Sequence, residues 1–291
     1  MTATTRLSLD DAGPQGRIAR ITLDNPSKLN ALTPGMLEDL LRISAEIGPD
    51  ERLRAVVLTG AGDRAFSGGM HIEALASPAQ GASPSQGASP SQGVSPSPGA
   101  SPSPGAAREL IALLHGACRA IRALPVPVIT RILGPCIGGA LELAASCDLR
   151  IAAETAVFAM PEVRLGIPSV IEAALLPRLV GWGKAREMVY LGRSYAAAEA
   201  MAMGLVERVV PPEELDAAVS EWLADLLSAG PRAIRLQKEL IGLWESLPPD
   251  EAIRAGVDYF ARAFESDEPA RLLGAALEER ERRRRNRPGT R

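Results

Sequence analysis

Strand-like and helix-like hydrophobic patterns alternate along the first half of the chain, and this alternation limits the fold more than any other feature. "RIARITLD" (17–24) has the two-residue period of a strand and "RAVVLTG" (54–60) is a short apolar run, while residues 34–47 between them have a helical period. The pattern is that of a βαβ unit and predicts an α/β fold. The segments predicted next are a helix at 107–123, a strand at 126–133, a helix over 132–148, and short strands at 147–153 and 156–160.

Nearly every segment after Pro168 has a helical pattern. Helices are predicted at 168–180, 183–191 and 196–203, the last of them closed by Gly204. A brief strand at 206–210 follows, and then helices from about 212 to 285. We therefore expect an α/β core in residues 1–200 and a helical C-terminal region in residues 201–291.

An inserted repeat interrupts the core. Residues 77–106 form five hexapeptides, SPAQGA, SPSQGA, SPSQGV, SPSPGA and SPSPGA. A segment with proline in every unit and no large apolar side chain cannot offset the entropy that its ordering would cost. We expect a mobile, partly extended loop there.

Charge and cysteine usage narrow the classes of protein to consider. The net charge of −3 and the pI of about 5.6 argue against a protein that binds nucleic acid or anionic membrane over its whole surface. No window approaches the ~20 apolar residues of a membrane span, and the first residues lack the apolar core of a signal peptide. Cys118, Cys136 and Cys147 have apolar neighbours and no CxxC spacing, which indicates reduced, buried thiols rather than metal ligands. We expect a cytoplasmic protein without a metal.

Two glycine pairs point to a site for a developing oxyanion. In "ILGPCIGGALELAASCD" (132–148), the amide of Gly139 would be unpaired if a helix begins there. In "RAFSGGMHIEAL" (64–75), a strand runs into a second pair, and the amide of Gly68 is the candidate for another donor. Two such amides would form an oxyanion hole that stabilises a carbonyl as it becomes an enolate.

Two glutamates accompany these glycines. Glu142 lies about one turn inside the expected helix, and Glu162 follows a proline at a strand end. In an apolar pocket, burial and mutual repulsion raise the pKa of carboxyl groups, so one of them can hold a proton near neutral pH. The pair is therefore suited to general acid and base chemistry.

Six strings of the sequence together resemble the crotonase superfamily, in particular its enoyl-CoA hydratases and isomerases. The resemblance covers roughly residues 15–265 and implies a spiral of ββα units, a helical C-terminal trimerisation region, and a homotrimer or a dimer of trimers. It implies an acyl-CoA thioester as substrate and no separate cofactor, because coenzyme A is part of the substrate. The strings are "NPSKLNAL", "AFSGGMHI", "GPCIGGALELAASCDLRIA", "FAMPEVRLGIP", "GWGKAREMVYLG" and "AAEAMAMGLVERVVP".

The resemblance also implies a role for individual residues. Glu142 would activate the water that adds to the β-carbon, Glu162 would exchange the proton at the α-carbon, and the amides of Gly68 and Gly139 would form the oxyanion hole. The residues implied to bind the thioester are Gly68, Gly69, Met70 and His71, and those implied to line the nucleotide end of CoA are Lys28, Leu29, Asn30 and Ala31.

The sequence departs from the family pattern at several positions. His71 stands where an aspartate is common, and "GIPSVIEAALL" replaces a glycine-rich turn, which brings Ser169 and Glu172 near the expected acyl chain. Taken alone, Glu172 is more typical of a helix surface, and His71 and His115 of packing or surface positions.

Three other functions remain open. An isomerase or another thioester-enolate enzyme would use the same oxyanion hole. A non-catalytic homologue that binds RNA would use the C-terminal run "ERRRRNRPGTR". Ser67 as a nucleophile, as in Clp-type proteases, lacks a histidine and an aspartate at matching places.

Overall fold

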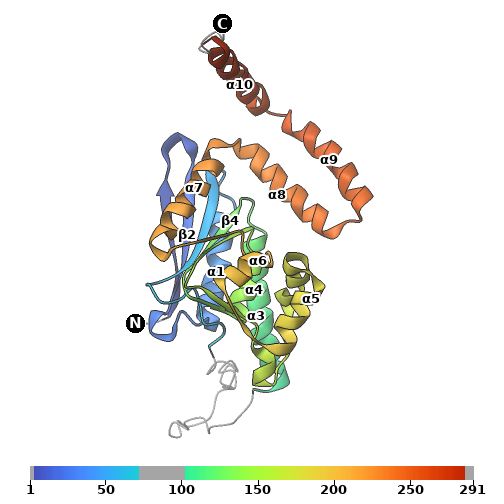
Figure 1. Cartoon of the computed structure of the whole chain (residues 1–291). Helices are drawn as coiled ribbons and strands as arrows, with labels where there is room; N and C mark the ends of the chain where they lie inside the picture. The colour runs from blue at the N-terminus through green and yellow to red at the C-terminus, as the bar shows by residue number, and fades with distance from the viewer. Residues whose placement is uncertain (1–2, 72–101, 286–291) are drawn as a thin grey trace, which may run out of the picture.

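The computed structural model describes residues 3–71 and 102–285 and has a six-stranded sheet in the order β1-β2-β3-β4-β6-β9 (Figure 1). The β1 and β2 strands pair antiparallel, and the other neighbouring strands pair in parallel. The strands are β1 (Thr4–Asp11), β2 (Arg17–Asp24), β3 (Leu53–Gly60), β4 (Val128–Ile132), β6 (Leu149–Ala153) and β9 (Arg208–Val210).

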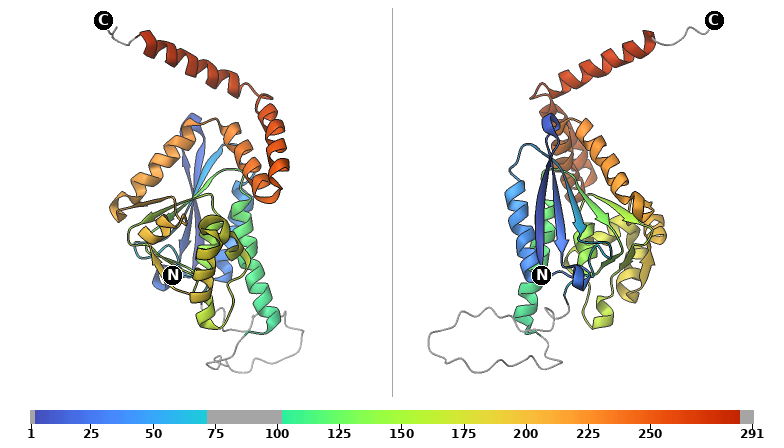
Figure 2. Two further views of the ribbon diagram at one scale, coloured as in Figure 1. Left: turned by 45° about the vertical axis from the view of Figure 1, so that its right-hand side comes forward. Right: turned by 90° about the vertical axis from the view of Figure 1, so that its left-hand side faces the viewer.

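Helices cover both faces of this sheet. In the left view of Figure 2, α7 (Leu215–Ser228) lies on one side of the sheet, and α1 (Pro34–Ile47) and α3 (Pro104–Arg122) lie on the other. Successive side chains of a strand point to opposite faces. Val56 and Leu58 of β3 therefore join the core beneath α1 and α3, while Ala55 and Val57 join the core beneath α7. Burial on both faces explains why this strand is a continuous apolar run.

A second, smaller sheet carries the short strands next to the glycine turn. Its order is β5-β7-β8, with β5 and β7 parallel and β8 antiparallel to β7. The strands are β5 (Pro135–Ile137), β7 (Val157–Ala159) and β8 (Ser194–Ala196). β5 is followed by α4 (Gly139–Ala145), and β7 is followed by the 3₁₀ helix η3 (Glu162–Leu165). Because β5 and β7 are parallel, residues 138 and 162 lie at the same end of this sheet.

Helices make up most of the chain after residue 170. In Figure 1, α8 and α9 lie beside the core, and α10 extends away from it. No helix among the residues described is long and apolar enough to cross a membrane. The remaining helices are α5 (Leu176–Leu191), α6 (Ala197–Ala202), α8 (Pro231–Ser246), α9 (Pro249–Ala263) and α10 (Glu268–Arg285), and the remaining 3₁₀ turns are η1 (Gly13–Gln15), η2 (Pro26–Lys28), η4 (Ile171–Leu175) and η5 (Pro212–Glu214).

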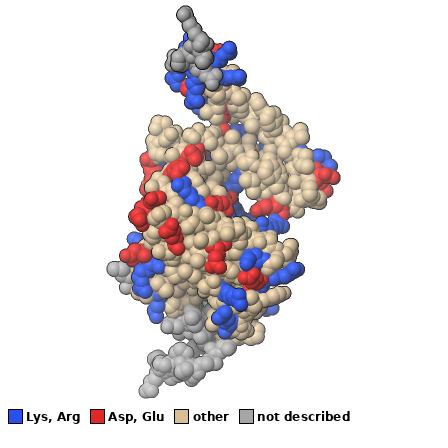
Figure 3. Space-filling view, in the orientation of Figure 1, with Lys and Arg blue, Asp and Glu red and all other residues tan. Residues whose placement is uncertain are grey.

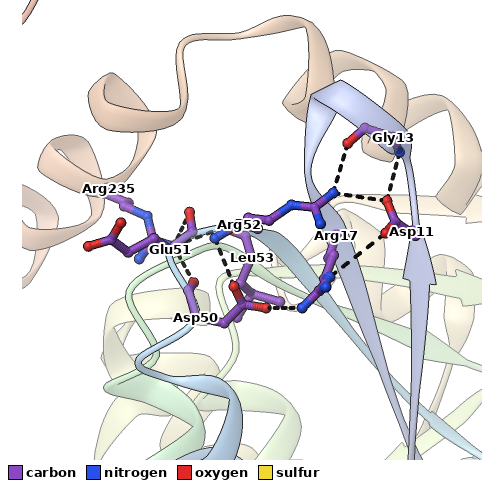
Figure 4. Close-up of polar contacts among 8 residues, drawn as sticks. All are labelled: Asp11, Gly13, Arg17, Asp50, Glu51, Arg52, Leu53 and Arg235. Atoms are coloured by element: carbon purple, nitrogen blue, oxygen red, sulfur yellow. Dashed lines mark hydrogen bonds and ion pairs between the residues drawn. The ribbon is translucent and has the colours of Figure 1, made fainter.

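Arginine side chains tie the C-terminal helices to the sheet. Arg235 of α8 donates hydrogen bonds of 2.9 Å from Nη2 to the carbonyl oxygens of Asp50 and Leu53 (Figure 4). The buried Arg54 of β3 donates a 2.7 Å bond to the carbonyl oxygen of Ala229, just after α7. The last carbonyls of a helix have no partner within it. These arginines therefore fix where α7 ends and where α8 crosses the core.

The predicted alternation of strands and helices is confirmed, but several local expectations are wrong. β1 and β8 were not predicted. The stretch 132–148 is not one helix, because β5 occupies Pro135–Ile137 and α4 only Gly139–Ala145. The stretch 168–180 is not one helix either. The 3₁₀ turn η4 precedes α5, and Gly181 interrupts α5 with a φ of 75°.

Part of the repeat is ordered, contrary to expectation. Helix α3 begins at Pro104, inside the last hexapeptide, rather than at residue 107. Ser103 caps the helix, because its Oγ accepts a 3.2 Å bond from the amide of Ala106, and proline suits the first helical position. The repeat from 77 to 101 lies outside the described residues. The proposed boundary between residues 200 and 201 stays a prediction.

Candidate active site

The glycine pair at 138–139 forms the turn between β5 and α4. Gly138 has a φ of 55°, in the left-handed region that favours glycine, and its amide donates a 2.8 Å bond to the carbonyl oxygen of Ala159. Gly139 is the first residue of α4, where an amide has no partner within the helix. A Cβ on Gly139 would lie 2.8 Å from Cδ2 of Leu114 and 3.3 Å from Cγ of Met70. The amide of Gly139 therefore lies beside the second glycine-rich segment.

In the second glycine-rich segment, the amide that can serve as a donor differs from the one expected from the sequence. The amide of Gly68 donates a 2.8 Å bond to the carbonyl oxygen of Leu29, so it is occupied within the chain. Met70 forms a parallel bridge with Leu32, in which Leu32 bonds to the carbonyl of Gly69 and the amide of His71. Such a bridge turns the amide of Met70 to the opposite side, away from Leu32. In this structure Met70, rather than Gly68, offers the amide that accompanies Gly139.

Glu142 lies in the first turn of α4, and only 4% of its surface is exposed. Its Oε1 accepts a 2.9 Å hydrogen bond from the amide of Ala173 in η4. Burial raises the pKa of Glu142 to about 8, and the nearby carboxylates of Glu162 and Glu172 add to this rise, while the Ala173 amide opposes it. A carboxyl group with this pKa exchanges its proton near neutral pH.

Glu162 is the first residue of η3, directly after Pro161, and it is half-buried. Its Oε2 accepts a 2.9 Å bond from Oγ of Ser169, one of the residues in the unusual stretch after it. Its Oε1 faces the glycine turn, because a Cβ on Gly138 would lie 2.5 Å from it. The two predicted glutamates are thus brought together at one turn, where one can hold a proton while the other accepts one.

Glu172 is not the surface residue that its sequence context indicated. It lies in η4 and is 8% exposed. Its Oε1 is 2.7 Å from Nδ1 of His115, which projects from α3. Sequence patterns missed this pair because its members are 57 residues apart and neither belongs to a recognisable motif.

The segment implied to line the nucleotide end of CoA forms a tight turn beside Gly68. Leu29 and Asn30 have positive φ values of 51° and 54°. The Asn30 side chain is buried and donates 2.9 Å bonds to the carbonyl oxygens of Ala61 and Ala65. Lys28 is exposed and Ala31 is buried. This arrangement offers mainly backbone to a ligand.

The structure gives no support to the other nucleophilic or metal sites considered. Ser67 is fully buried, and its Oγ accepts a 3.2 Å bond from the amide of Gly69. The three cysteines are buried free thiols. Within residues 3–71 and 102–285, no group of three or more His, Cys, Asp or Glu side chains is arranged to hold a metal ion.

The arginines at the C-terminal end gather on α10 (Figure 3). Arg282 and Arg283 pair with Glu279, and Arg285 pairs with Glu281, at helical spacings of three or four residues. A cationic run that is partly paired with glutamates of its own helix is typical of a solvated helix surface. It provides little basis for RNA binding.

Known proteins resemble this chain over most of its length. The family model described as enoyl-CoA hydratase/isomerase matches residues 13–93 and 112–282. A short-chain-enoyl-CoA hydratase from Clostridium acetobutylicum is 31% identical over 267 residues, which cover 91% of this chain and 93% of that protein. A crotonyl-CoA hydratase from Syntrophomonas wolfei is 32% identical over 265 residues, with the same two coverages of 91% and 93%.

A solved structure also resembles the chain over nearly its whole length. The structure of a Thermobifida fusca YX protein in complex with CoA superimposes with a TM-score of 0.74 at 31% sequence identity. The match covers 94% of this chain and 95% of that one.

Proposed function

The chain belongs to the enoyl-CoA hydratase/isomerase family and has the crotonase fold, and we propose that it adds water across the 2,3 double bond of a short-chain 2-enoyl-CoA thioester. The pair of carboxylates, Glu142 and Glu162, held at the Gly138 turn carries this proposal. The hydratase names of two relatives support it.

The thioester carbonyl oxygen, in this proposal, accepts hydrogen bonds from the amides of Met70 and Gly139. Both amides belong to backbone that is fixed by neighbouring strands, so they need no reorganisation when charge develops on the oxygen. The nucleotide end of CoA lies along Lys28, Leu29, Asn30 and Ala31. The bound CoA of the Thermobifida fusca protein supports a CoA site in this fold.

The proton steps use both glutamates. The ionised carboxylate of Glu142 takes one proton from a water molecule, whose oxygen forms a bond to the β-carbon. The π electrons of the double bond move toward the thioester oxygen and give an enolate, which the two amides stabilise. Glu162, in its protonated form, then gives its proton to the α-carbon. One water is added in total, and a proton passes from Glu142 back to Glu162 to reset the pair.

The reaction so described needs no metal or redox cofactor, since the carboxylates and amides supply all its proton transfers and charge stabilisation. Coenzyme A enters as part of the substrate. The three buried free thiols support a reducing compartment, which we propose to be the cytoplasm.

We further propose that the chain assembles as a homotrimer or as a dimer of trimers. Helix α9 and the residue that caps it expose four large apolar side chains at spacings of three or four residues, Ile253, Val257, Phe260 and Phe264. A continuous apolar stripe of this kind marks an interaction surface.

Crotonyl-CoA tests the activity directly. We expect the purified protein to remove the absorbance of the conjugated thioester and to give a product heavier by one water. Glu142→Gln and Glu162→Gln should each lower kcat by about 10²- to 10⁴-fold. Glu154→Gln, which removes an exposed carboxylate after β6, is the matched control and should leave kcat unchanged. Wild-type rates in either active-site variant would refute the proposal, and a product of unchanged mass would assign the isomerase chemistry instead.

A further inference from the structure

Glu172 is a buried carboxylate near Glu142 that pairs with the exposed His115, and the proposed hydration step does not use this pair. Oε1 of Glu172 is 2.7 Å from Nδ1 of His115. Within the part of the chain that the structure describes, Oε2 of Glu172 is buried without a hydrogen-bond partner. Burying a carboxylate oxygen in this way costs free energy. A purely structural link between α3 and η4 would not require it.

The backbone on both sides of Glu172 is unusual. The next residue, Ala173, gives its amide to Oε1 of Glu142 at 2.9 Å. The preceding residue, Ile171, has a φ of 40°, a region that β-branched residues rarely enter. Strain of this kind costs about 1–3 kcal/mol and persists only where the surroundings impose it. The turn is therefore held in one conformation, with its amide on the first glutamate.

The titratable groups around Glu142 come from several elements. Glu162 from η3 and Glu172 from η4 both lie close enough to add to the rise in the pKa of Glu142 that burial causes, and burial also raises the pKa of the Cys118 thiol from α3, with Glu172 and Glu142 adding to that rise. His115, also from α3, contacts Glu172 rather than Glu142. Glu172 thus acts on Glu142 in two ways, through its charge and through the turn that it anchors.

We propose that Glu172 is a positioning residue for Glu142: anchored by His115, it fixes the turn that presents the Ala173 amide and sets a negative charge beside the first glutamate. This inference rests on the proposed hydration, in which Glu142 is the base. A carboxylate that holds its proton more tightly is the stronger base once it is ionised. The negative charge of Glu172 therefore promotes removal of the proton from water.

The first test replaces Glu172 by glutamine, which keeps the shape and can still contact His115. Ionisation of Glu142 is followed directly by the infrared band of its protonated carboxyl group, identified by its loss in Glu142→Gln. We expect this titration in Glu172→Gln to move to lower pH, because a like charge has been removed. The low-pH limb of kcat should move with it, and kcat at its plateau should fall by about three- to tenfold while KM stays within about twofold.

The second test separates anchoring from packing at His115. His115→Gln keeps a donor for Glu172 and should retain kcat within about twofold, whereas His115→Leu removes the donor and should lower kcat by about tenfold with KM little changed. Equal kcat values for the two variants would overturn the anchoring role. Glu154→Gln serves again as the remote control.

The infrared titration also distinguishes this inference from the hydratase proposal. A wild-type protein that does not hydrate crotonyl-CoA, but whose Glu142 titration moves in Glu172→Gln, would refute the activity and keep the coupling. A Glu142 titration that is the same in both proteins would overturn the inference whether or not hydration occurs, even if the melting temperature falls.

Discussion

A Cβ atom on Gly138 would lie 2.5 Å from Oε1 of Glu162, closer than two such atoms can pack. The φ of 55° at this residue, directly after β5, already favours glycine, and any side chain here would also have to displace the Glu162 carboxylate.

Gly138→Ala should damage both the fold and the reaction. The new methyl group would displace the Glu162 carboxylate or force the turn to move, and the positive φ adds strain. We expect the free energy of unfolding to fall by about 1–3 kcal/mol and kcat to fall by about 10²-fold or more, measured by denaturant unfolding and by crotonyl-CoA turnover.

Gly242→Ala is the control for this change, because a Cβ at this position in α8 would meet nothing within 4 Å. Alanine is the better helix former, so the free energy of unfolding should stay the same or rise by up to about 1 kcal/mol, with kcat unchanged. Equal behaviour of Gly138→Ala and Gly242→Ala would show that the turn tolerates a side chain.

The pH dependence of the rate should follow the ionisation of Glu142. Its pKa is raised to about 8, so the group is mostly protonated at neutral pH and becomes a base only as pH rises. Because Glu142 must be ionised to accept a proton from water, we expect kcat/KM to rise as the pH approaches about 8, and the residual activity of Glu142→Gln to lack this limb. A rate that instead falls as the pH approaches 8 would make Glu142 the proton donor and reverse the two roles.

The main elements could be predicted because their signals are local. Residues 17–24, 34–47 and 54–60 contain their own periodicity, and each of them forms the expected strand or helix. β1 is not predicted from the sequence because it is an edge strand in which Leu9 is exposed, so its sequence shows little apolar alternation. The stretch 132–148 looked like one helix because its β5 residues are as apolar as those of α4.

The details of the site depend on partners that are distant in sequence. The string "AFSGGMHI" does not reveal that the amide of Gly68 donates to the carbonyl oxygen of Leu29. The bridge between Leu32 and Met70, which determines that the Met70 amide points away from Leu32, is visible only in the fold. The Ala173 amide on Glu142 likewise depends on how η4 packs against α4. The two glutamates could therefore be identified from the sequence, whereas the amide donors of the site could be identified only from the folded structure.

An amide-to-ester exchange distinguishes the two candidate donors of the oxyanion hole. Replacing residue 70 by its α-hydroxy acid counterpart removes only the N–H of Met70 and should lower kcat by about 10²- to 10³-fold. The same exchange at Gly68 removes its hydrogen bond to the carbonyl oxygen of Leu29. Its main effect should therefore be a lower melting temperature, with a smaller loss of kcat than the exchange at residue 70. Met70→Ala, which keeps the amide, is the control and should retain most of the activity. A larger kcat loss at Gly68 than at Met70 would restore the assignment made from the sequence.

The apolar stripe on α9 gives a test of assembly. Phe260 is exposed at its centre, between Val257 and Phe264. A charge at this position would have to be desolvated in an interface, so we expect Phe260→Glu to convert the proposed trimer or dimer of trimers into a 30.6 kDa monomer, as measured by light scattering or sedimentation. Glu251→Lys, in the exposed first turn of the same helix, is the control and should leave the mass unchanged. A wild-type monomer, or an unchanged mass for Phe260→Glu, would show that this stripe does not join the subunits.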